Sequence, residues 1–352
     1  MKGLWKFLSP FAPDQSGSTA VFCELDGLII IIDAGGCAGN ICGFDEPRWF
    51  EKRSAIFSAG LRDMDAILGR DDRLISKIKD VSRQIEGKFV ALIGTPVPAV
   101  IGTDYKALKR MIEVETGIPA LALDTDGVHY YDVGCEKAWL ALFRSFTENT
   151  YGMEPGHYGV IGATPFDVPK EGLHFGGPGI YHCYGMGSGV DEIKSAGSVI
   201  KNLVVAPSGL KAARYLARRF GTPYEVGYPL DQIEGFDGFM DHMRAILSAD
   251  MDVKKILIVH QQVLAHSLRE ELRKHTKAMI QLASWFEMDK ELREPWDIPL
   301  LEEDQWIRLA EEGEYDVIIG DQLLSQAIPG YQGEFIALNH FAISGKPLGF
   351  VI

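Results

Sequence analysis

Short apolar runs alternate with longer amphipathic stretches along nearly the whole chain, and this alternation limits the fold more than any other feature. The apolar run at 27–33 precedes a helical pattern at 72–87, and the same order returns at 88–94 and 104–117. Buried parallel strands are short and apolar, whereas their connecting helices carry apolar residues at helical spacing. The sequence therefore predicts an α/β protein built on parallel sheets.

The alternation restarts twice along the chain, and three α/β units are therefore predicted. A Gly- and Pro-rich stretch at 152–156 closes the first series, and the apolar run at 254–260 opens the third. We place the units at 1–150, 151–250 and 251–352. Ligands of open α/β sheets lie beyond the carboxyl ends of the strands, so the loops that follow the strands should hold the functional residues.

Composition and charge narrow the classes of partner. Hydrophobic residues make up 46% and charged residues 24% of the 352, which is ordinary for a globular protein. The net charge of -14 argues against nucleic acid and anionic membranes, because phosphate binding needs clustered Lys and Arg. Lys6, Pro10 and Pro13 interrupt the N-terminal apolar stretch, so no signal peptide is expected, and no stretch is long enough for a membrane helix. We expect a cytoplasmic protein whose five cysteines are free thiols or metal ligands.

The segment 33–43, DAGGCAGNICG, is the sharpest local feature. Glycines such as Gly36 and Gly39 permit close backbone approach to a bound group, and the thiolates of Cys37 and Cys42 can ligate an iron–sulfur cluster. A 4Fe-4S cluster takes about four thiolates, so a dimer with this segment on its two-fold axis would complete the set. Two alternatives stay open: buried small cysteines beside a turn, and a zinc site, although no paired histidine stands nearby.

The other three cysteines are interpreted first as structural residues. Cys23 lies in a predicted strand at 20–25. Cys135 lies near the start of a predicted helix, where a helix N-terminus can lower a thiol pKa, but a core position is the favoured interpretation. Cys183 follows His182 in a Gly-rich, aromatic stretch that could line a pocket.

Motifs for several other chemistries are absent from the sequence. The GMGSG segment at 185–189 lacks the spacing of a dinucleotide-binding loop, and no GxxxxGK[ST] motif occurs. We therefore expect no ATP site in this chain. Neither a GxSxG elbow nor an HExxH zinc motif is present.

Six segments follow the order of motifs in one known family: 28–40, 57–80, 89–108, 118–128, 203–240 and 315–328. Together they resemble the nitrogenase component 1 family. Its members include the nitrogenase molybdenum–iron protein subunits, their cofactor-assembly scaffold, protochlorophyllide and chlorophyllide reductases, and the coenzyme F430 reductive cyclase. The resemblance spans nearly the whole chain and implies three Rossmann-like units.

The sequence departs from that family at the cluster ligands. Only Cys37 stands at a matching position, because 9–17 holds no cysteine and Pro96 lies where the family often has Cys-Pro. The resemblance therefore implies a single 4Fe-4S cluster shared between two chains, with Cys42 recruited beside Cys37, rather than an eight-iron cluster. Asp14 is a candidate oxygen ligand or supporting group.

The resemblance implies an anaerobic reductase component that is a homodimer, or a heterodimer with another component 1 chain. An ATP-dependent iron protein would supply electrons through the interfacial cluster to an unknown substrate. Ala206 stands where nitrogenase holds its cofactor with a cysteine, so dinitrogen is not the expected substrate. Asp126, His129 and His182 are the predicted proton donors, because their loops should face the cleft between units. Two alternatives stay open: a scaffold or carrier for a metal cluster or tetrapyrrole, and a metal-free binding paralogue.

Overall fold

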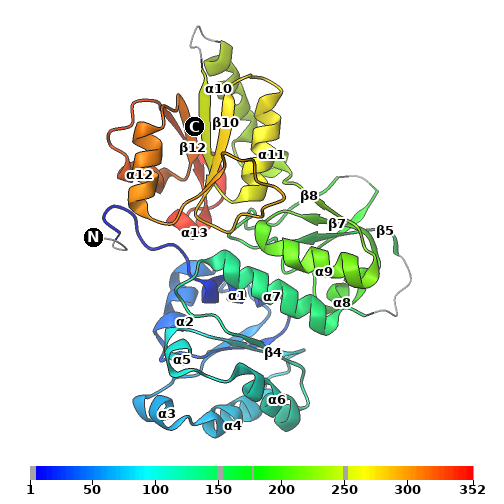
Figure 1. The fold of residues 1–352 in the computed structure, drawn as a ribbon. Coiled ribbons are helices and arrows are strands. Elements are labelled where there is room, and N and C mark those ends of the chain that lie inside the picture. The colour runs from blue at the N-terminus through cyan, green and yellow to red at the C-terminus, as the bar shows by residue number, and fades with distance from the viewer. Residues whose placement is uncertain (1–4, 149–153, 177, 249–252, 352) are drawn as a thin grey trace.

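Three sheets of mostly parallel strands organise the chain (Figure 1). The computed structural model describes residues 5–148, 154–176, 178–248 and 253–351. The predicted α/β class is confirmed. The predicted junctions at 150/151 and 250/251 lie outside the described residues, as does the start of the 152–156 stretch, so the domain limits stay predictions. No helix in the described ranges has both the length and the apolar character that crossing a membrane requires.

The first sheet has the order β2-β1-β3-β4, and every pair is parallel. Its strands are β1 (Leu28–Ile31), β2 (Ala55–Ser58), β3 (Val90–Ile93) and β4 (Ala120–Leu123). Its helices are α1 (Asp14–Phe22), α2 (Gly36–Asn40), the π-helical turn η1 (Ile41–Asp45), α3 (Asp63–Leu68), α4 (Asp71–Ser82), α5 (Pro96–Ile101), α6 (Tyr105–Thr116) and α7 (Tyr131–Phe146). All residues of β1 and β3 are buried, which explains why these strands are apolar without alternation.

The second sheet repeats this topology with the order β6-β5-β7-β8. Its strands are β5 (Glu154–Ile161), β6 (Ile180–Cys183), β7 (Val199–Val204) and β8 (Tyr224–Val226). Its helices are α8 (Val190–Lys194), the short 3₁₀ turns η2 (Ser195–Gly197), η3 (Pro207–Gly209) and η4 (Leu230–Gln232), and α9 (Leu210–Phe220).

The third sheet has the order β11-β10-β9-β12-β13-β14, the Rossmann arrangement with an antiparallel edge strand. Its strands are β9 (Lys255–Val259), β10 (Met279–Ser284), β11 (Ile298–Pro299), β12 (Val317–Gly320), β13 (Glu334–Asn339) and β14 (Gly349–Val351). The helices are α10 (Phe236–Ser248), α11 (Gln262–Arg273), α12 (Glu303–Glu312), the 3₁₀ turn η5 (Gln322–Ala327) and α13 (Phe341–Ser344). Helix α10 packs on this sheet, since Phe239 stacks on Phe350 of β14 with ring centroids 4.1 Å apart.

Helices α1 and α7 cross at a contact that only glycine permits. A Cβ at Gly17 would lie 1.9 Å from the carbonyl oxygen of Tyr131, and one at Gly134 would lie 1.8 Å from that of Asp14. The two backbones therefore touch directly. In Figure 1, α7 crosses the middle of the molecule, with the first sheet on one side and the other two units on the other. The crossing thus fixes the first turn of α1 at the place where the units meet.

Helix α1 corrects the predicted strand at 20–25. Cys23 follows the last residue of α1 and is fully buried. All nine residues of the helix are buried, so its apolar positions show no helical period in the sequence. The predicted structural role of Cys23 agrees with its burial.

Candidate functional site

The candidate site lies at the carboxyl edge of the first sheet. The connection after β1 leads to β2 on one side, and the connection after β3 leads to β4 on the other. Diverging connections of this kind leave a crevice at the strand ends, where α/β proteins bind their ligands. Asp33 follows β1, Thr95 follows β3 and Asp126 follows β4 at this edge.

The two candidate ligand cysteines lie on consecutive helical segments after β1. Cys37 is in α2 and Cys42 is in η1, and both are partly exposed. Asp33, which is buried, accepts the backbone N–H of Ala38 at 2.8 Å and so fixes the start of α2. The thiol of Cys42 donates to the carbonyl oxygen of Gly39 at 3.2 Å.

Cys37 lies between the ends of β1 and β3. Burial raises the pKa of the Cys37 thiol, and the Asp33 carboxylate raises it further, while the nearby Thr95 hydroxyl opposes both effects. Thr95 is itself held by donating its hydroxyl to the carbonyl oxygen of Ile32 at 2.7 Å. Because metal binds the thiolate, a metal at Cys37 must displace this proton.

We call α2 and η1, residues 36–45, the cysteine segment. Two groups that the sequence analysis did not identify hold its far end. Asp45 accepts hydrogen bonds from Ser16 of α1 at 2.6 Å and from Asn40 at 2.7 Å. Arg48 is buried and forms a bidentate pair with Glu46 at 2.8 Å. Polar residues directly after an exposed cysteine segment are the only signal for them in the sequence.

Arg48 also ties this segment to the second unit. Its guanidinium donates to the carbonyl oxygens of Ala20 at 2.7 Å and Gly185 at 2.9 Å, and it pairs with Glu24 at 2.8 Å. Glu24 in turn accepts the backbone N–H of Gly187 at 2.7 Å. The GMGSG segment at 185–189 therefore binds the first unit through hydrogen bonds to Arg48 and Glu24.

The cysteine segment is open on its outer side. A side chain built onto Gly35, Gly36, Gly39 or Gly43 would meet no atom within 4 Å. Large apolar side chains of η1, α3 and α5 are exposed, and we call them the exposed apolar face: Phe44, Met64, Ile67, Leu68, Val97, Val100 and Ile101. In Figure 1, α2, α5 and α3 follow one another down one side of the first unit. Two partly exposed thiols fit half of the ligand set of a 4Fe-4S cluster.

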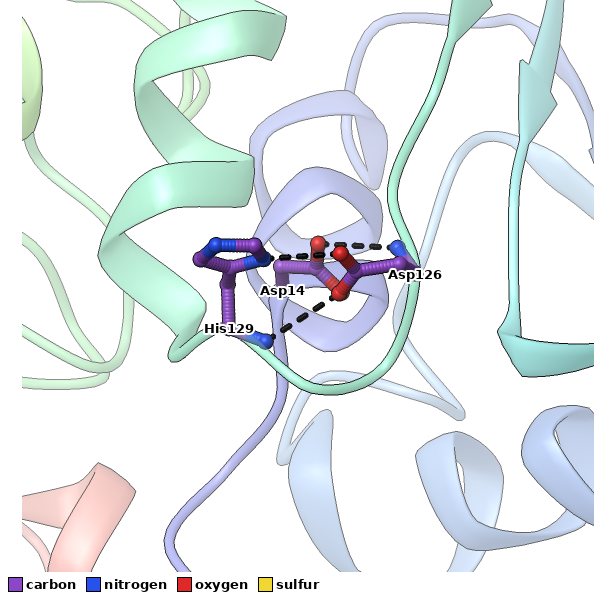
Figure 2. Close-up of side chains that lie close together, drawn as sticks. All are labelled: Asp14, Asp126 and His129. Atoms are coloured by element: carbon purple, nitrogen blue, oxygen red, sulfur yellow. Dashed lines mark hydrogen bonds and ion pairs between the residues drawn. The ribbon is translucent and has the colours of Figure 1, made fainter. Parts of the chain in front are cut away.

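Asp126 and His129, two of the predicted proton donors, lie together with Asp14 (Figure 2). Asp126 accepts the backbone N–H groups of Val128 at 2.8 Å and His129 at 3.1 Å, and its carboxylate lies 2.8 Å from Nδ1 of His129. Partial burial acts to raise the pKa of Asp126, but these hydrogen bonds outweigh it and hold the pKa below its ordinary value.

Asp14 anchors this turn from α1. Its carboxylate accepts the backbone N–H groups of Asp126 at 3.0 Å and Gly127 at 2.8 Å. Burial raises the pKa of Asp14, and these two hydrogen bonds oppose the rise. The ligand atoms of Asp14, Asp126 and His129 lie within 4.8 Å of one another, a spacing that suits a cation. The hydrogen bonds of Asp126 also orient the exposed His129 ring.

His182 is not part of this group. It lies on β6, at the edge of the second sheet, with its Nε2 atom 2.9 Å from Nδ1 of His157 on β5. Its role as a proton donor stays a prediction.

The remaining cysteines are inside the protein. Cys135 is fully buried on α7, and burial raises the pKa of its thiol well above the ordinary value. Burial likewise raises the pKa of Cys183 to about 12. Both are poor metal ligands in this fold, and Cys37 and Cys42 are left as the partly exposed pair.

Asp14→Asn is expected to lower the free energy of unfolding by about 1–3 kcal/mol, because an amide offers one acceptor oxygen where two partly buried N–H groups need partners. Hydrogen exchange at 126–129 should accelerate in parallel. Asp124→Asn is the control, since Asp124 is exposed and pairs with Lys137 at the surface. Equal exchange at 126–129 in the two variants would show that Asp14 does not hold the turn.

The comparisons with known proteins agree with this architecture. The sequence profile described as nitrogenase component 1 type oxidoreductase matches residues 15–290. The nitrogenase iron-molybdenum cofactor biosynthesis protein NifE of Klebsiella pneumoniae is 27% identical over 129 residues. That match covers 33% of this chain and 28% of the relative's length.

Solved structures of nitrogenase Cp1 share the fold. The structure at pH 6.5 has a TM-score of 0.65 and 14% identity, covering 98% of this chain and 88% of the solved one. The structure at pH 5 also has a TM-score of 0.65, with 12% identity over 91% of this chain and 81% of the solved one. Since the profile matches well over half of the sequence, the chain belongs to the nitrogenase component 1 type oxidoreductase family.

Proposed function

We propose that this chain is component 1 of a nitrogenase-like reductase. Cys37 and Cys42 of two chains would together hold one 4Fe-4S cluster, and an ATP-dependent iron protein would supply electrons for an unknown substrate other than dinitrogen. The observation that carries this proposal is the partly exposed cysteine pair, fixed at a strand-end crevice beside an exposed apolar face. When bound, the cluster would take up and release single electrons.

The residues around the cysteine pair support this assignment. The two places where the family's other cysteines would fall, 9–17 and Pro96, meet at the same edge, because a Cβ at Gly127 would touch both Pro96 and Gln15. Asp33, Asp45 and Arg48 fix the segment, so its two thiols are held on a rigid base. His129, held by Asp126, is the candidate for moving a proton at this edge.

The exposed apolar face is the surface that the second chain would cover. Large apolar side chains grouped on one face commonly mark protein contacts. Val100→Asp is therefore expected to weaken the dimer at least about tenfold, which corresponds to about 1.4 kcal/mol. Sedimentation velocity across a concentration series measures the change.

Val114 on α6 provides the matched control for Val100. It is 81% exposed and Val100 is 87% exposed, but α6 lies on another part of the first unit (Figure 1). Val114→Asp should leave the dimer intact. Dissociation by Val114→Asp with an intact Val100→Asp dimer would place the contact elsewhere.

The reductase proposal is tested by electron transfer. Anaerobically reconstituted protein is mixed with a nitrogenase-type iron protein, MgATP and dithionite, and the iron–sulfur absorption is followed. ATP-dependent bleaching beyond that of the iron protein alone, absent in Cys37→Ala, is the expected result. No bleaching with a fully loaded cluster would contradict electron transfer from such a partner.

A scaffold or carrier is the second candidate. It is favoured by the match to a cofactor biosynthesis protein and by the absence of cysteine at 9–17 and at Pro96. This function predicts that a loaded cluster leaves the chain when an apo acceptor protein is added. Retention of the iron through repeated exposure to the acceptor would argue against it.

A further inference from the structure

A buried hydrogen-bond chain joins the three units at one tyrosine hydroxyl. Tyr131, the first residue of α7, donates its hydroxyl to Oδ1 of Asp167 at 2.7 Å, in the loop after β5. Its oxygen lies 3.2 Å from Nε2 of His340, in the turn after β13. The three side chains are no more than 1% exposed. One hydroxyl thus connects segments that follow strands of the first, second and third sheets.

The hydrogen-bond partners set the direction of this chain. Nδ1 of His340 accepts the backbone N–H of Ala342 at 3.2 Å, so the neutral ring carries its proton on Nε2. Burial and the adjacent His260 ring lower the pKa of His340 well below the ordinary value, which keeps the ring neutral. His340 therefore donates a hydrogen bond to the Tyr131 oxygen, and the Tyr131 hydroxyl donates a hydrogen bond to Asp167.

Asp167 is a buried carboxyl group, and within the described part of the chain no ion pair joins it to a lysine or arginine. Burial raises its pKa to about 8, although the hydroxyls of Tyr131 and Thr164 oppose this rise and Asp132 adds to it. The other titratable groups at this junction are Tyr131, Asp132, Cys135, Tyr228, His260 and His340. Glu287 acts on Asp132, and Arg48 acts on Cys135. Burial therefore keeps this carboxyl group protonated to a higher pH than an exposed aspartate, and the group becomes an anion as the pH rises.

We propose that Asp167 is a proton-operated latch for the junction of the three units. In its neutral form, it lets α7, the loop after β5 and the turn after β13 stay packed without water. In its ionised form, Asp167 is a buried anion without a counter-charge. Opening the junction to water then relieves the desolvation free energy of this charge. This latch does not depend on the cysteine pair or on the proposed function.

The sign of the pH dependence follows from the raised pKa. Asp167 has a pKa of about 8 in the closed junction and the ordinary value of 3.8 when the junction is open to water. Between these two pH values, opening releases one proton. Opening should therefore become easier as pH rises through this range and level off above it. Hydrogen exchange by mass spectrometry, corrected for intrinsic rates, measures opening at 131–140, 162–168 and 338–344.

Asp167→Asn isolates the contribution of this one group. The ratio of opening constants, wild type over variant, should rise about tenfold per pH unit up to about pH 8, because one proton is released. The variant should keep its protection at pH 9. A constant ratio across the pH series would overturn the proposal.

Two further variants separate Asp167 from its neighbours. Burial raises the pKa of Asp132 to about 7, so it could also titrate with opening. In Asp132→Asn the pH dependence of opening should remain but shift to lower pH, because Asp132 raises the pKa of Asp167. The latch would be refuted if the pH dependence were lost in Asp132→Asn and kept in Asp167→Asn. Tyr131→Phe removes a donor that holds the Asp167 pKa down, so the levelling-off should move to higher pH. If Asp167→Asn does not fold, Tyr131→Phe decides the question: levelling-off at higher pH supports the latch, and levelling-off at an unchanged or lower pH contradicts it.

Discussion

Arg48→Met is expected to lower the free energy of unfolding of the metal-free protein by about 3–5 kcal/mol, because it leaves a buried carboxylate without its counter-charge. Glu46 is 4% exposed and has Arg48 as its bidentate partner. The variant also removes donors to the carbonyl oxygens of Ala20 and Gly185. Urea unfolding at pH 7 measures the loss.

Arg53→Met is the matched control for this prediction. Arg53 pairs with Asp26 at the surface, where an ion pair contributes at most about 1 kcal/mol. Adding Glu46→Gln to Arg48→Met should restore part of the stability, because the buried charge is then gone. If Arg48→Met and Arg53→Met unfold at the same urea concentration, the buried pair does not stabilise the segment.

Cys37→Ala is expected to reduce the iron content from about four per dimer to background, because a 4Fe-4S cluster has four thiolate ligands and the variant dimer offers two. Cys42→Ala should have the same effect if both thiols reach one cluster. Iron analysis and absorption after identical anaerobic reconstitution measure both losses. The chain should remain folded, because both side chains are partly exposed.

Cys135→Ala is the control for the cysteine variants. Its thiol is fully buried and donates to the carbonyl oxygen of Gly17, so its loss should leave the iron content unchanged. Full iron content in Cys42→Ala would remove Cys42 from the ligand set. Loss of iron in Cys135→Ala alone would contradict the choice of the cysteine pair.

The central strands β1 and β3 were predictable because all of their residues are buried, so both strands are apolar throughout. The runs at 27–33 and 88–94 contain β1 and β3, and the helical pattern at 104–117 contains α6. Helix α1 was not predictable, because a fully buried helix shows no amphipathic period. The antiparallel β14 was missed as well, since three residues carry too little pattern.

The candidate site was predictable only where its residues are close in sequence. Asp126 and His129 are three positions apart and share one turn, as their proximity implies. Asp14 and Asp126 are 112 positions apart, and the glycine crossing of α1 and α7 brings them together. The contacts of Arg48 with Ala20 and Gly185 could not be predicted, because they are made to backbone carbonyl oxygens, which leave no trace in side-chain patterns.

The most direct measurement is the iron and acid-labile sulfide content of anaerobically reconstituted protein, determined together with the mass of the same sample. The proposed interfacial cluster predicts about four irons and four sulfides per dimer, and an iron-free monomer fraction. A monomer that carries a full cluster would contradict the sharing of ligands between chains. A dimer without iron after reconstitution would contradict the electron-transfer function and leave the fold as a binding scaffold.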